Sequence, residues 1–135
     1  MPGNFFDTNV LIYVVSGDAA KAETAALLLQ DGGTISVQVL NEIVNVLRRK
    51  LHRSWLRTHD FLTLVRACLL VRPVTVVTHD AGLEIAERYG LSIYDSMIVA
   101  AALDAECDTL WSEDMQHGLV VAGRLRVVNP FQQQG

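Results

Sequence analysis

Four acidic residues stand at positions where an α/β fold would gather their side chains: Asp7, Glu42, Asp95 and Asp114. Asp7 and Asp114 each follow a short apolar run, and Asp95 lies at the start of a helical pattern. In an open parallel sheet the carboxyl ends of all strands lie at one edge, and ligands bind there. These three acids fall at that edge, and Glu42 joins them if its helix begins near Ser36.

Carboxylates gathered in this way need a compensating charge. At a separation of ~4 Å each pair repels by about 4 kcal/mol at an effective dielectric constant near 20. The two lysines, Lys21 and Lys50, fall inside expected helices, so we do not expect an ammonium group among the acids. A hard divalent cation such as Mg²⁺ or Mn²⁺ takes oxygen ligands and keeps several waters. Such a site would activate water and clamp the oxygens of a phosphodiester during an in-line displacement.

Each acid also has a purely structural interpretation. Asp7 could cap the helix that follows it, and Ser92 with Asp95 matches the S-x-x-D capping pattern. Asp114 could cap a short helix, and Glu42 could lie on a solvated helix face. The functional interpretation therefore depends on the coincidence of four acids at one edge and on none of them alone.

The elements that must position these acids alternate along the chain. Short runs rich in Val, Ile and aromatic residues predict strands, and longer stretches with a 3.6-residue period predict helices. The expected strands are 4–6, 34–37, 74–77, 109–111 and 126–128. The expected helices lie between Asp18 and Gly32 and at 38–50, 58–70, 79–90 and 94–106. This alternation predicts an α/β fold with a parallel sheet.

Length and composition fit a single domain over 1–135, with 132–135 expected to be a frayed tail. Half of the 135 residues are apolar and 19% are charged, which favours a folded core over a disordered chain. The cysteines, Cys68 and Cys107, fall in apolar helical stretches and are expected to be free thiols. We see no apolar run of the ~18 residues that a membrane span needs and no signal-peptide pattern. The expectation is a cytoplasmic protein with no membrane partner.

Charge is unevenly distributed along the chain. The formal net charge is −4, which argues weakly against a dedicated reader of duplex DNA. The stretch 44–72 holds seven basic residues and one acid, so the rest of the chain carries about −10. A basic segment on an acidic body suits a phosphate backbone, although a solvated helix–helix connection would look the same. The candidates for contact with RNA are Arg48, Arg49, Lys50, Arg53 and Arg57.

Other chemistries lack their motifs in this sequence. It has no G-x-x-x-x-G-K-[ST] or G-x-G-x-x-G pattern, so a glycine-rich nucleotide-binding loop is not indicated. It also lacks the G-x-S-x-G pattern of a serine nucleophile elbow. The histidines show no metal-ligand spacing, and the cysteines form no C-x-x-C pair. The role of Glu113, which neighbours Asp114, stays open.

Four segments taken together resemble the PIN-domain ribonuclease family. They are DTNVLIY at 7–13, Ser36 with Glu42 six residues later, LSIYDSMIVAAA at 91–102, and LWSEDMQHG at 110–118. The closing VNPF at 128–131 also looks like the end of that family. The resemblance covers nearly the whole chain in order and spacing, and the size is similar to VapC-type toxins of bacterial toxin–antitoxin pairs.

The resemblance implies a PIN-like fold, a twisted four- to five-stranded parallel sheet sandwiched between helices. It also implies a Mg²⁺- or Mn²⁺-dependent endoribonuclease. Asp7 and Asp95 would be the primary metal ligands, Asp114 a further ligand, and Glu42 would act through water or a second ion. All four would be the catalytic residues of such an enzyme.

Supporting residues and partners follow from the same resemblance. Asn9 and Ser112 would orient water or a carboxylate. The implied partners are an RNA substrate, a small antitoxin protein whose tail can fill the acidic groove, and a second copy of the chain in a homodimer. The alternative is a non-catalytic PIN-like protein whose acidic groove only binds a partner. An acidic phosphoacceptor domain ranks last, because Asp7 stands without a paired acid or a placed lysine.

Overall fold

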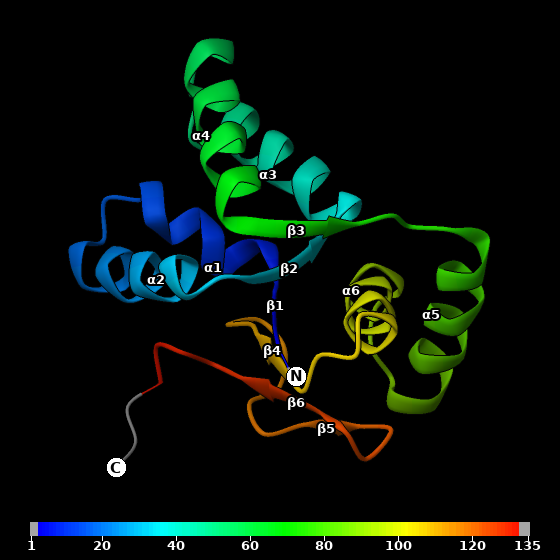
Figure 1. Cartoon of the computed structure of the whole chain (residues 1–135). Coiled ribbons are helices and arrows are strands. Elements are labelled where there is room, and N and C mark those ends of the chain that lie inside the picture. The colour runs from blue at the N-terminus through cyan, green and yellow to red at the C-terminus, as the bar shows by residue number, and fades with distance from the viewer. Residues whose placement is uncertain (1–2, 133–135) are drawn as a thin grey trace.

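A six-stranded sheet organises the chain, with the strands in the spatial order β3-β2-β1-β4-β6-β5 (Figure 1). The structure is a computed structural model that describes residues 3–132, so the predicted frayed tail lies outside the described residues except for Gln132. The strands are β1 (Asn4–Phe6), β2 (Gly33–Ser36), β3 (Leu69–Arg72), β4 (Thr109–Trp111), β5 (Val120–Val121) and β6 (Leu125–Val128). All pairs are parallel except β5 with β6. The predicted α/β fold with a parallel sheet is confirmed, with β5 as an added antiparallel edge strand.

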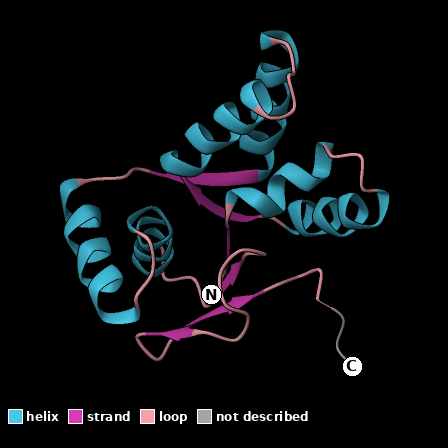
Figure 2. Cartoon of the chain, turned by 180° about the vertical axis from the view of Figure 1, so that it is seen from behind, coloured by secondary structure: helices cyan, strands magenta, loops and turns pink. Residues whose placement is uncertain are grey.

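Helices lie on both sides of this sheet. They are α1 (Thr8–Ile12), the short 3₁₀ helix η1 (Tyr13–Val15), α2 (Ala19–Asp31), α3 (Val37–Arg49), α4 (Trp55–Cys68), α5 (Val76–Tyr89) and α6 (Ile93–Asp104). In Figure 1, α1 and α2 lie on one side and α5 and α6 on the other. The α3–α4 pair projects from the β2–β3 part of the molecule, which Figure 2 shows from behind. Among residues 3–132, no helix has the length and apolar character that crossing a membrane requires.

The core forms around β1 and α6. Phe5 and Phe6 of β1 are fully buried, and every residue of α6 from Ser96 to Ala102 is buried as well. Three consecutive alanines, 100–102, allow α6 to lie close to its neighbours, and α5 covers it from outside (Figure 1). The buried middle of α6 therefore anchors the helix whose first turn carries Asp95.

The predicted strand at 74–77 is wrong. The strand lies earlier, at Leu69–Arg72, and pairs in parallel with β2. Pro73 lacks a backbone N–H and follows the end of that strand. Thr75 then caps α5 in a capping box with Thr78, so the valines at 76 and 77 open a helix with their side chains about three-quarters exposed.

Two other helix boundaries also differ from the prediction. The helix expected at 58–70 begins at Trp55, because the Ser54 side chain accepts a hydrogen bond from the Arg57 N–H and caps it. It ends at Cys68, where the chain passes directly into β3. Both cysteines are free thiols, as predicted.

Candidate functional site

All four acids selected from the sequence line one cavity of about 400 Å³. Asp7 caps α1 directly after β1, Glu42 lies on α3, Asp95 lies in the first turn of α6, and Asp114 lies in the loop after β4. Because α3 begins at Val37, directly after β2, Glu42 is close enough to join the other three. The structure thus gathers side chains that lie more than a hundred residues apart in the sequence.

Asp7 is the buried centre of this cavity, with 3% of its surface exposed. Its Oδ1 accepts a hydrogen bond at 2.7 Å from the N–H of Thr8, the first residue of α1. Its Oδ2 accepts from Ser112 Oγ at 2.7 Å and from Asn9 Nδ2 at 3.0 Å. Both supporting polar residues selected from the sequence therefore orient this carboxyl group.

The environment of Asp7 opposes its ionisation. Burial raises its pKa from 3.8 to about 6, against the effect of the hydrogen bonds from Ser112 and Thr8. The neighbouring charges of Asp95 and Glu42 raise the pKa further. The protein alone therefore compensates the negative charge at this position incompletely.

Asp95 and Asp114 line the same cavity, and their negative charges repel each other. Burial is the main reason that the pKa of Asp95 is raised, and the charge of Asp114 adds to it. Ser92 Oγ accepts a hydrogen bond from the Asp95 N–H at 3.1 Å, so the predicted capping pattern is present. Capping uses the backbone of Asp95 and leaves its carboxyl group in the cavity wall. Asp114 Oδ2 accepts from Asn9 Nδ2 at 3.1 Å, so one amide group bridges Asp7 and Asp114.

Glu42 is held by two residues that the sequence analysis did not select. Thr8 Oγ1 donates to Glu42 Oε1 at 3.0 Å, and Gln38 Nε2 donates to Oε2 at 2.9 Å. The same Gln38 amide group also donates to the Tyr94 carbonyl at the start of α6. The sequence offered a partial signal, because Gln38 lies one helical turn before Glu42.

The expectation that no ammonium group lies near the acids needs correction. Lys50 lines the cavity, and Lys21 forms an ion pair at its rim with Glu113. Burial opposes the ionisation of Glu113, but hydrogen bonds from Lys21 and Tyr13 outweigh it and lower the pKa of Glu113 below its usual value. In the described part of the chain, no salt bridge joins a lysine to any of the four selected acids. Their negative charge therefore stays without a direct cationic partner from the protein.

The donor set of the cavity suits a hard divalent cation, because all four acids offer carboxylate oxygens. Within residues 3–132, no three His, Cys, Asp or Glu side chains are already grouped closely enough to hold a metal ion. The donor chemistry fits such an ion, whereas the spacing of the side chains is more open than a closed coordination sphere.

The predicted basic segment divides into separate environments. Lys50 lines the acidic cavity, and Arg49 is exposed at the end of α3. Arg48 Nη1 donates to the Arg53 carbonyl at 2.8 Å, and its guanidinium lies 4.3 Å from the centre of the Trp55 ring. Arg48 is therefore engaged in holding the α3–α4 connection, which agrees with the structural interpretation of this segment.

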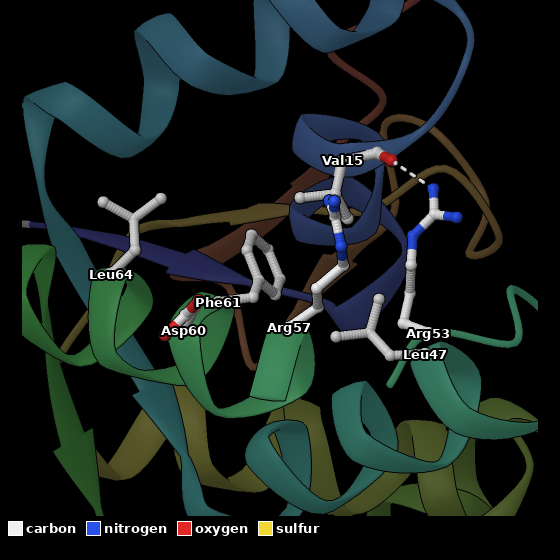
Figure 3. A pocket seen from close by; sticks show the side chains of 7 residues that line it. All are labelled: Val15, Leu47, Arg53, Arg57, Asp60, Phe61 and Leu64. Atoms are coloured by element: carbon white, nitrogen blue, oxygen red, sulfur yellow. Dashed lines mark hydrogen bonds between the residues drawn. The ribbon is translucent and has the colours of Figure 1, made fainter. Parts of the chain in front are cut away.

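Arg53 and Arg57 line a second cavity of about 400 Å³, whose remaining lining residues are Val15, Leu47, Asp60, Phe61 and Leu64 (Figure 3). Arg53 Nη2 donates to the Val15 carbonyl at 3.2 Å, which ties the α3–α4 connection to η1. This cavity shares no lining residue with the acidic one. Arg53 and Arg57 thus line a different cavity from that of the four acids.

Comparison with known proteins places this geometry in a family. The family model described as the PIN domain matches residues 5–119. No curated protein sequence matches the chain significantly.

Several solved structures share the fold. A toxin–antitoxin complex from Klebsiella pneumoniae gives a TM-score of 0.71 at 20% identity, covering 96% of this chain and 99% of that chain. The Sarcin-Ricin loop cleaving toxin VapC20 from Mycobacterium tuberculosis gives 0.64 at 19% identity, covering 82% and 89%. DNA-bound VapBC from Salmonella typhimurium gives 0.65 at 18% identity, covering 94% and 97%. At these identities the similarity establishes the fold alone, so the activity must be argued from the residues of the site.

Proposed function

The chain belongs to the PIN domain family, and from this premise we propose that it is a Mg²⁺- or Mn²⁺-dependent endoribonuclease, the toxin of a toxin–antitoxin pair. The observation that carries the proposal is the cavity in which four carboxylates from separate elements meet. Asp7, with its raised pKa of about 6, marks a site whose charge the protein leaves incompletely compensated. Perturbed carboxyl groups gathered in a cavity are characteristic of functional sites.

Each acid has a distinct place in this proposal. Asp7 and Asp95 would hold the cation, with Asp114 as a further ligand and Glu42 acting through water or a second ion. A bound Mg²⁺ or Mn²⁺ would supply the Lewis acidity that activates water and stabilises the phosphodiester oxygens. The protein's own contribution is orientation, because Asn9 and Ser112 fix the carboxyl group of Asp7 through hydrogen bonds.

The substrate in this proposal is RNA in a single-stranded or loop region. Lys50 lines the acidic cavity, and Arg49 is exposed at the preceding position, the last residue of α3, so both are available to a phosphate backbone. Arg48 and Arg53 are already committed to carbonyl groups of the protein, which makes them weaker candidates for this contact.

A small antitoxin is the proposed protein partner. The structural relatives include a toxin–antitoxin complex and VapBC, which supports this assignment. An acidic cavity of this kind is complementary to a basic tail on the partner. We retain a homodimer as the proposed assembly.

The test is cleavage of a pool of structured RNAs by the purified chain in Mg²⁺, Mn²⁺ or EDTA, followed by mapping of the RNA ends. We expect discrete cleavage with either metal and none in EDTA. The variants Asp7→Asn and Asp95→Asn should each lower cleavage by at least about a hundredfold while remaining folded. Undiminished cleavage by both variants would defeat the assignment. Intact RNA together with tight binding of a basic peptide would instead favour the non-catalytic alternative.

A further inference from the structure

A compact network of polar and aromatic side chains lies at the rim of the acidic cavity. Lys21 Nζ, from α2, donates to Glu113 Oε2 at 2.5 Å and to the Tyr13 hydroxyl at 3.3 Å. The Tyr13 hydroxyl donates to the other oxygen of Glu113 at 2.6 Å. The ammonium group also lies 4.6 Å from the centre of the Tyr13 ring and 5.3 Å from that of Phe131. Both oxygens of Glu113 are thus engaged.

This network connects directly to the acids of the cavity. The Glu113 N–H donates to Asn9 Oδ1 at 3.0 Å, and Asn9 Nδ2 donates to both Asp7 and Asp114. Asp114 follows Glu113 within the loop at 112–119, which contains no helix or strand. The buried residues Ser112 and Met115 anchor this loop on either side of the two acids. The side chain of Glu113 is what fastens this loop to α2.

We propose that Lys21, Tyr13 and Glu113, here called the rim network, position Asp114 opposite Asp7 for divalent-cation binding. This inference rests on the proposed function. The rim network holds the side chain of Glu113, and Asn9 holds its backbone N–H together with the carboxyl groups of Asp7 and Asp114. These contacts constrain where Asp114 lies relative to Asp7. None of the three residues needs to touch the ion, and partners of this kind around metal ligands alter metal affinity substantially.

An ordinary ion pair on the surface is the competing explanation. The side chains of Lys21 and Glu113 are 33% and 24% exposed, and isolated ion pairs on a protein surface contribute little to stability. The two explanations predict opposite changes in the affinity for a divalent cation when Lys21 is replaced by an uncharged residue. Lys21 carries a positive charge near the cavity, so simple removal of that charge should strengthen the binding of a divalent cation. Loss of a positioning contact should weaken it.

Lys50 supplies a matched control. It lines the same cavity and carries the same charge, and it belongs to no salt bridge within the described residues. Replacing Lys50 by Met therefore makes the same charge change without touching the rim network.

The experiment measures Mn²⁺ binding to the full chain by titration calorimetry, with free Mn²⁺ followed by electron paramagnetic resonance. We expect Lys21→Met to weaken Mn²⁺ binding by roughly tenfold or more, and Tyr13→Phe to weaken it less. Lys21→Arg, which keeps the charge and a donor, should restore most of the affinity. Lys50→Met should bind Mn²⁺ as tightly as the unaltered chain or more tightly.

Circular dichroism of each variant reports whether it is folded. Should Lys21→Met fail to fold, Tyr13→Phe, which removes a single hydroxyl group, decides the question. Binding of Mn²⁺ by folded Lys21→Met or Tyr13→Phe as tight as that of the unaltered chain overturns the positioning role and leaves the proposed function intact. If the unaltered chain itself binds no Mn²⁺, the proposed metal-dependent function fails first and the positioning role fails with it.

Discussion

Asp7 links the stability of the fold to the chemistry of the site. Its carboxyl group is almost fully buried, and its pKa lies at about 6 in the folded chain compared with 3.8 for an ordinary aspartate. Below about pH 4 the group is protonated in both the folded and unfolded states and costs nothing. As the pH rises from 4 to 6, Asp7 ionises in the unfolded chain before it ionises in the folded chain, so the free energy of unfolding falls. Above about pH 6 the group is ionised in both states, and its contribution no longer changes with pH.

Substitution of Asp7 by Asn should therefore stabilise the metal-free protein at neutral pH. The shift of the pKa to about 6 corresponds to a gain of up to about 3 kcal/mol at pH 7.5, reduced because an amide matches the donors of Ser112 and Asn9 less well. Denaturant unfolding in EDTA at pH 7.5 and pH 4 measures this directly. The advantage of the variant should shrink towards pH 4. If the variant is instead destabilised equally at both pH values, the ionisation of Asp7 does not lower the stability of the fold.

At the scale of single residues, the acids could be predicted and the donors that hold them could not. The acids follow strands or open helices, and this placement can be derived from sequence periodicity alone. Whether Thr8 reaches Glu42, or Lys21 reaches Glu113, depends on distances between segments far apart in the chain. Sequence spacing carries no information about such distances.

At the scale of elements, the close pairing of β1 and β2 sets the position of Glu42 relative to Asp7. Gly33 opens β2 with a φ of 151°, a conformation that other residues rarely adopt. A Cβ atom there would lie 2.6 Å from the Asn4 carbonyl oxygen and 2.8 Å from the Phe6 ring. These contacts belong to backbone and to a buried aromatic ring, so neither can move cheaply.

The variant Gly33→Ala should lose at least about 2 kcal/mol of unfolding free energy, from overpacking and the strained φ together. Gly17→Ala is the matched control, because an added Cβ at Gly17 meets nothing within 4 Å. It should change stability by less than about 0.5 kcal/mol. Thermal and urea unfolding of both variants give the comparison, and equal stabilities would contradict the tight β1–β2 pairing.

The error at 74–77 has a physical explanation at the same scale. A run rich in valine and threonine suits a strand, but it also suits the exposed first turn of a helix when a capping residue precedes it. The decisive features were Pro73, which follows the end of β3, and the Thr75 capping box. Both are local signals, so this boundary was open to prediction from the sequence.

At the scale of the whole molecule, the alternation of strands and helices was sufficient to predict the parallel α/β fold. The strand order and the projecting α3–α4 pair (Figure 1) depend on packing between distant segments and were not predicted. The shared direction of β1, β2 and β4 brings together Asp7, Glu42 and Asp114, which is why their gathering could be expected in advance. The place of Asp95 depends in addition on how α6 packs against the sheet. That Arg53 and Arg57 line a different cavity from the acids could be seen only in the three-dimensional structure.

We propose that this fold brings its four carboxylates together around a divalent cation. Diffraction from crystals saturated with Mn²⁺, with the anomalous signal of manganese recorded, tests it most directly. We expect an anomalous peak in the acidic cavity, with oxygens of Asp7 and Asp95 at about 2.0–2.3 Å from it. A cavity without a peak, whose four acids point away from one another into solvent at saturating Mn²⁺, would contradict it.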